Sequence, residues 1–100
     1  MQPHTVSGEV IKNGADGTER TLMCPPEENV MGGGFSVSPG SGRHLESTPA
    51  DVLTSRPTAD ATGWIVAVRK QDLSAAGNGA EPADLTLQVV CTEGESSTMA

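Results

Sequence analysis

The positions of the two cysteines constrain the fold of this chain more than any other feature of its sequence. Cys24 begins the stretch CPPEENVMGGGF, which ends at Phe35, and Cys91 ends the apolar run LTLQVVC. Each cysteine is in phase, at the two-residue spacing of a β-strand, with apolar residues that precede it, so both sulfur atoms should face the core. A disulfide between them would enclose almost the whole predicted core and contribute about 4 kcal/mol through chain entropy. Two buried free thiols are the alternative.

Alternating apolar and polar residues, separated by Gly, Pro, Asn and Asp turns, predict short strands along most of the chain. The predicted strands are Thr5–Lys12, Glu19–Cys24, Val30–Ser38, a short one within 43–49, Gly63–Arg69 and Leu85–Cys91. We expect a long irregular connection at residues 50–63, where prolines oppose a helix, and a loop at Asp72–Asp84. Residues 93–100 should form a polar tail.

This pattern predicts one all-β domain over residues 1–100, with its core at about 5–92 and almost no helix. We expect a small antiparallel β-sandwich or barrel-like domain with Greek-key or meander connections. Only 18 of the 100 residues are Leu, Ile, Val or Phe, so the core is thin. A domain of this kind should need a covalent link or a partner to be stable.

Three consecutive glycines interrupt the strand predicted at Val30–Ser38. Such glycines mark a bulge, a sharp bend or the close approach of another backbone. Two-residue spacing places Met31, Gly33, Phe35 and Val37 on one face. A phosphate-binding loop is not expected, because the Lys and the Ser or Thr that it needs are missing at the required offsets. The residues to which we assign core or structural roles are Gly32, Gly33, Gly34, Phe35 and Trp64.

The charge of the chain argues against a nucleic-acid partner. There are 13 acidic and 6 basic residues, a net charge of −7, and no basic residue follows Lys70. Phosphate contacts require clustered Lys and Arg, and no such cluster is present. The acidic second half indicates either a solvated surface or a docking surface for a basic partner. We expect no membrane partner, because no apolar run is long enough to span a bilayer. The first ten residues also lack the pattern of a signal peptide.

No motif points to catalysis, so the sequence predicts a protein that is not an enzyme and needs no cofactor or metal. His4 and His44 are isolated in turn-like sequence, and the chain has no GxSxG nucleophile motif. The adjacent pair Glu27 and Glu28 should diverge rather than form a glycosidase pair. A zinc site is not expected, because neither cysteine belongs to a CxxC motif.

Several short motifs resemble a small β module that recurs in actinobacterial secreted proteins and in virion proteins of their phages. The shared order is CP, GGG with a hydrophobic residue, a serine-proline element, GW and a final cysteine strand. The matching residues are Cys24-Pro25, Gly32-Gly33-Gly34-Phe35, Ser47-Thr48-Pro49, Gly63-Trp64 and Val89-Val90-Cys91. The serine-proline element matches only loosely, and the resemblance covers about residues 20–92. It implies a disulfide-closed sandwich used for display or attachment, and it brings no catalytic residues.

We therefore expect a structural virion protein of a bacteriophage, a small capsid decoration or accessory protein that stabilises the shell from the virion surface. Its partners would be the major capsid protein or other virion subunits. Exchange of an N-terminal strand between copies would provide a route to homo-oligomers such as trimers. The alternative is a secreted or tail-associated module that binds a cell-surface glycan or protein through residues 39–62 and 72–84.

Overall fold

The computed structural model describes residues 2–74 and 79–93, and this part of the chain is all β-structure without helix. Its nine strands pair only in the antiparallel sense. The strands are β1 (His4–Ser7), β2 (Arg20–Met23), β3 (Glu28–Ser38), β4 (Arg43–Leu45), β5 (Asp51–Pro57), β6 (Gly63–Arg69), β7 (Gln71–Ser74), β8 (Ala80–Pro82) and β9 (Asp84–Glu93). The expected fold class is therefore confirmed.

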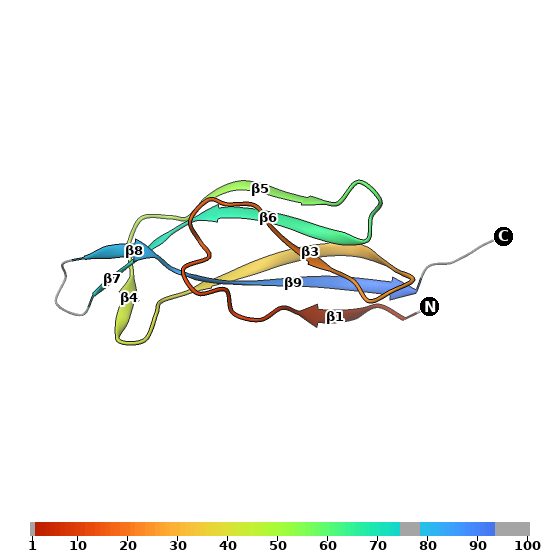
Figure 1. Ribbon diagram of the computed structural model, residues 1–100, viewed down its shortest axis with the longest axis horizontal. Coiled ribbons are helices and arrows are strands. Elements are labelled where there is room, and N and C mark those ends of the chain that lie inside the picture. The colour runs from red at the N-terminus through yellow and green to blue at the C-terminus, as the bar shows by residue number, and fades with distance from the viewer. Residues whose placement is uncertain (1, 75–78, 94–100) are drawn as a thin grey trace.

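The strands form three small sheets, of which two make a sandwich. One sandwich sheet has the order β1-β9-β3 and the other β2-β6-β5. They pack face to face, with β3 over β5 and β6, and β2 over β9. The third sheet, β4-β7-β8, lies at one end of the elongated molecule (Figure 1). Below, we call this end the distal end and the opposite one the disulfide end.

One long hairpin joins the sandwich to the distal end. β6 runs through Lys70 into β7, and β8 runs through Ala83 into β9. β7 and β8 pair with each other, whereas β6 and β9 separate into opposite sheets. The segment 11–17 fills the point of separation, where Ala15 is fully buried and its amide donates to the carbonyl of Ala83 at 3.0 Å. The amide of Lys70 donates in turn to the carbonyl of Ala15 at 3.0 Å.

The core lies between the sandwich sheets and comes mainly from β6 and β9. Val66, Val68, Leu85 and Val89 have no exposed surface. The alternation predicted for Leu85–Cys91 is confirmed, because every second side chain of this run is buried. The large buried side chains are few, in agreement with the thin core that the composition predicts.

A disulfide joins Cys24 to Cys91, as expected, and closes a loop with a sequence separation of 67. Cys24 follows β2 directly, and Cys91 lies near the end of β9. The bond therefore fastens one sheet of the sandwich to the other, close to where β3 begins.

The prediction of an irregular connection at 50–63 is wrong, because β5 occupies half of it. β5 pairs with β6 along its whole length and is the outermost strand of its sheet. Pro57 is its last residue. A proline is tolerated there because an edge strand does not need every amide for pairing. Prolines oppose a helix, but they do not exclude an edge strand.

Three other boundaries differ from the prediction. The loop expected at Asp72–Asp84 contains most of β7 and all of β8, while its residues 75–78 lie outside the described residues. The strand expected at Thr5–Lys12 ends early: β1 stops at Ser7, and Val10 is exposed. Of the expected tail 93–100, Glu93 belongs to β9, and residues 94–100 lie outside the described residues.

The expected position of Met31 is also wrong. Val30 lies opposite Cys91 and Gly32 opposite Val90, so Met31 is an extra residue in β3. Such a bulge interrupts the alternation of side chains. Met31 is 60% exposed instead of sharing the inner face with Phe35.

Candidate binding groove

The three glycines of β3 lie in the middle of its pairing with β9 and have different surroundings. Gly32, Gly33 and Gly34 lie opposite Val90, Val89 and Gln88. None of the three has a positive φ, so a turn conformation does not explain them. The space around the Cβ position that each glycine lacks distinguishes them.

Gly33 is itself exposed, but its missing Cβ would point at the ring of Trp64. A Cβ atom on Gly33 would lie 2.3 Å from Cγ of the indole, a distance that no real contact allows. Trp64 packs against the core, and its Nε1 donates a hydrogen bond to Oγ of Ser55 at 3.0 Å. Phe35, two residues further along β3, packs against the same core. Phe35 and Trp64 thus pack against the core, and Gly33 lies against the Trp64 ring.

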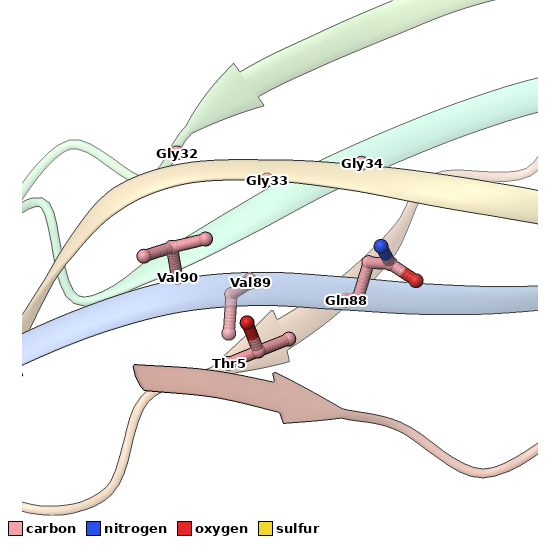
Figure 2. Close-up of a pocket in the computed structure, with 7 residues that line it drawn as sticks. All are labelled: Thr5, Gly32, Gly33, Gly34, Gln88, Val89 and Val90. Carbon is pink, nitrogen blue, oxygen red and sulfur yellow. The ribbon is translucent and has the colours of Figure 1, made fainter. Parts of the chain in front are cut away.

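Gly32 and Gly34 face outward, and the fold leaves the space beside them empty. A Cβ atom on either would meet nothing within 4 Å. Both glycines line a groove of about 200 Å³ on the outer face of the β1-β9-β3 sheet (Figure 2). We call it the glycine groove, and its lining residues are Thr5, Gly32, Gly33, Gly34, Gln88, Val89 and Val90.

The groove adjoins a free strand edge. Among the described residues, β3 is the outermost strand of its sheet and pairs only with β9. At the start of β3, the amide of Val30 donates to the carbonyl of Ala61 at 2.8 Å, so a loop covers that part of the edge. From Gly32 to Ser38, no other strand in the described part of the chain pairs with the open side. Backbone donors and acceptors on that side are available to another strand.

The sheet that carries the groove is acidic or neutral. Its three strands contain Glu28, Asp84 and Glu93 but no Lys or Arg. At the disulfide end, Pro26, Glu27, Glu28 and Glu93 line a second hollow of about 340 Å³. The groove thus has an apolar floor with an acidic hollow further along the same strands.

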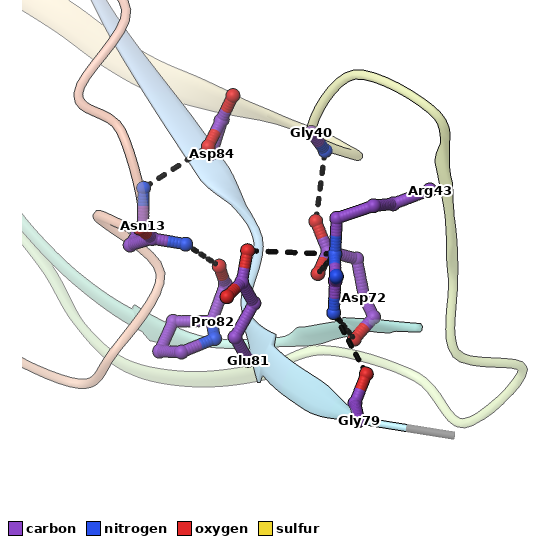
Figure 3. Close-up of polar contacts among 8 residues, drawn as sticks. All are labelled: Asn13, Gly40, Arg43, Asp72, Gly79, Glu81, Pro82 and Asp84. Atoms are coloured by element: carbon purple, nitrogen blue, oxygen red, sulfur yellow. Dashed lines mark hydrogen bonds and ion pairs between the residues drawn. The ribbon is translucent and has the colours of Figure 1, made fainter. Parts of the chain in front are cut away.

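A different arrangement holds the distal end, where the carboxylate of Asp72 is fully buried (Figure 3). The amide of Gly40 donates to its Oδ2 at 2.8 Å, and Nε of Arg43 donates to its Oδ1 at 2.7 Å. Nη2 of Arg43 also donates to the carbonyl of Gly79 at 2.8 Å. Burial of the carboxyl opposes ionisation, but the Gly40 amide and the Arg43 guanidinium outweigh it and lower the pKa of Asp72.

The charged cluster at the distal end has the properties of a structural link. Every oxygen of the Asp72 carboxylate has a partner within the chain, which is the requirement for burying a charge without a large cost. Nε of Arg43 also lies 3.4 Å from Oε2 of Glu81. Arg43 in β4 therefore contacts carboxylates from both β7 and β8. The cluster leaves no carboxylate oxygen of Asp72 open for a substrate.

The two histidines, which the sequence shows in isolated positions, also lie far apart in the structure. Nε2 of His4 lies 3.0 Å from Oε1 of Glu28 at the disulfide end, whereas His44 lies in β4 at the distal end. Within residues 2–74 and 79–93, no group of three or more His, Cys, Asp or Glu side chains is placed to hold a metal ion. The same residues contain no helix long and apolar enough to cross a membrane.

The sequence did not indicate all residues of the groove. Thr5 and Gln88 were not singled out, and Val90 was named only as part of the final cysteine strand, although the outward positions of β9 follow from the alternation that places Leu87 and Val89 inward. The Arg43–Asp72 link had no sequence signal, because both residues fall in segments expected to be short or irregular.

Comparison with protein-family models, with curated proteins and with solved structures finds no match to this chain. The small all-β domain with its single disulfide fits the module that the sequence resembles. A disulfide is also compatible with an extracellular or secreted protein.

Proposed function

We propose that the chain is a structural protein of a bacteriophage virion, a small decoration or accessory protein that binds the outside of the capsid and stabilises the shell. The single observation that carries this proposal is the disulfide-closed sandwich with an open edge at β3 that is uncharged from Gly32 to Ser38. It has the architecture that the resemblance implies, and it offers backbone and apolar surface for contact. The proposal assigns no catalysis to the chain.

Binding to assembled subunits would stabilise the shell by mass action, because the protein would bind the assembled state and not its separated subunits. Exposed apolar side chains are available for such contacts. They are Val10, Met23, Met31, Val52 and Leu53. The partners would be the major capsid protein or other virion subunits. Copies could also associate with one another by exchanging β1, a four-residue edge strand.

The test compares shells with and without the protein. Purified shells that lack it should break at lower temperature and lower salt than complete shells, and addition of the oxidised protein should restore their resistance. Equal resistance of both preparations would contradict the proposed function.

The second candidate is a binding module for a cell-surface glycan or protein. One observation favours it: the glycine groove presents Thr5 and Gln88, both exposed polar side chains, beside an apolar floor. A glycan array and a cell-wall pull-down distinguish the candidates, because a shell protein should give background signal in both. The segments 39–62 and 72–84, which the sequence analysis assigns to such recognition, contain strands β4, β5 and β8 and most of β7.

A further inference from the structure

Gly32 and Gly34 weaken β3 without serving its fold. A glycine inside a strand has high conformational entropy when unfolded and contributes no side chain to packing. Gly33 is explained by the indole of Trp64, but the Cβ positions of Gly32 and Gly34 are open and their φ angles are not positive. Since nothing within the described chain requires these two glycines, their small size points to something that approaches from outside.

The position of the groove indicates what approaches. It lies beside the open edge of β3, where backbone donors and acceptors from Gly32 to Ser38 lack a second strand. A strand that paired there would place every second side chain on the outer face, next to the glycines. A large apolar side chain on that strand would fill the open space beside Gly32 and Gly34, as aromatic residues do for edge glycines in designed sheets.

Charge indicates the composition of that strand. The sheet contains no Lys or Arg, and the hollow beyond the groove is lined by Glu27, Glu28 and Glu93. A second copy of this chain fits poorly. It would carry a net charge of −7 to a site of the same sign, and the outward residues of its own β3 are only Gly and Ser beyond the bulge. A basic segment with a large apolar side chain complements both features.

The other edges of the sandwich are less suitable. β1 and β2 have four residues each, and β2 begins with Arg20. β5 carries Asp51 and Arg56, ends at Pro57 and has an irregular register at Leu53. Charges, prolines and bulges are features that keep edge strands from pairing with other chains. From Gly32 to Ser38, β3 has none of them.

We propose that the open edge of β3 binds an extended, basic segment of a partner protein by strand addition, with a large apolar side chain of that segment in the glycine groove. This inference deepens the proposed function by naming the contact, and it rests on that function only for the source of the segment, a capsid subunit. The contact buries the groove and satisfies the open backbone groups together.

The test uses a display library of random dodecapeptides, selected on the immobilised, oxidised full chain. Selected peptides should be rich in Lys and Arg and carry a large apolar residue between residues of high β propensity. Binding constants of the best peptide are then measured for three proteins: the native chain, Gly34→Val and Ser7→Val. Ser7 is an exposed residue of β1 in the same sheet, but it lies outside the groove and away from the open edge of β3, so its variant controls for a bulkier strand.

We expect Gly34→Val to weaken binding at least tenfold and Ser7→Val to change it less than about twofold, with both variants folded by circular dichroism. Failure to select any peptide that prefers the native chain to Gly34→Val would overturn the inference. Acidic consensus peptides would overturn it as well. So would a dimer in light scattering that Gly34→Val dissociates, because the occupant would then be a second copy. The shell-resistance experiment is independent of these outcomes, so failure of the contact and failure of the proposed function can be distinguished.

Discussion

The two ends of the molecule are held together in different ways. At the disulfide end, Cys24–Cys91 joins the sandwich sheets covalently, and the glycine groove lies on an outer face without basic residues. At the distal end, β4, β7 and β8 are held by a buried carboxylate and the guanidinium of Arg43. The disulfide end, which carries the candidate binding site, is thus held by a covalent bond that does not titrate. The distal end is held by an ion pair that is lost when Asp72 is protonated.

The largest effect should follow from removing the disulfide. The double variant Cys24→Ala with Cys91→Ala frees a loop with a sequence separation of 67, so the free energy of unfolding should fall by about 4 kcal/mol. This is comparable with the whole stability of a small domain. Denaturant unfolding of the native and variant chains measures the difference. An unchanged midpoint would show that the thin core suffices alone.

Removing the buried carboxylate should open the distal end and leave the disulfide end in place. Asp72→Ala removes the carboxylate that accepts from the Gly40 amide and from Nε of Arg43, and the loss of such charged hydrogen bonds costs about 2 kcal/mol. Hydrogen exchange should therefore accelerate in β4, β7 and β8 but not at the centre of β9. Equal acceleration in both regions would mean that the two ends unfold together.

Low pH should likewise destabilise the distal end before the disulfide end. The pKa of Asp72 is lowered from its ordinary value of 3.8, so the folded state favours the ionised form. The stability from this group is fully present above the unfolded pKa and is lost as pH falls below 3.8 toward the folded pKa. Nuclear magnetic resonance during acid titration should show β4 and β7 losing order before β9. Asp72→Asn is the control, and it should lack this step.

The smallest effect should come from the exposed ion pair on the sandwich. Nη2 of Arg56 lies 3.7 Å from Oε2 of Glu19, and both side chains are more than half exposed. Such pairs contribute about 0.5 kcal/mol or less, because solvent screens them. Arg56→Thr should leave the denaturation midpoint nearly unchanged. A loss as large as that of Asp72→Ala would contradict the contrast between buried and exposed pairs.

The sequence predicted the parts of the fold that rest on local patterns. Strict alternation in Leu85–Cys91 placed the core face of β9 and the inward position of Cys91 correctly. It placed Met31 wrongly, because the glycine triplet indicated that a bulge was possible but not at which residue the register would shift. It also missed β5, whose pairing depends on β6 rather than on its own apolar residues.

The candidate site was predictable only in part, because its contacts join residues that are distant in the sequence. The glycine triplet marked the right strand, but its three members look identical in the sequence. Only the packing of Trp64 on Gly33 separates the one that the fold needs from its two neighbours. The Arg43–Asp72 pair joins residues far apart in the chain, and nothing near either residue indicates its partner.

Parallel denaturant unfolding of Gly32→Ala, Gly33→Ala and Gly34→Ala tests the central claim most directly. Gly33→Ala should lose about 1–3 kcal/mol, because its methyl group would overlap the Trp64 ring, 2.3 Å from Cγ. Gly32→Ala and Gly34→Ala should keep the native stability or gain about 0.4–1 kcal/mol, since their Cβ positions are open and the unfolded chain loses freedom. Similar losses in all three variants would show that the whole triplet serves the fold, and the groove would then need no partner to explain it.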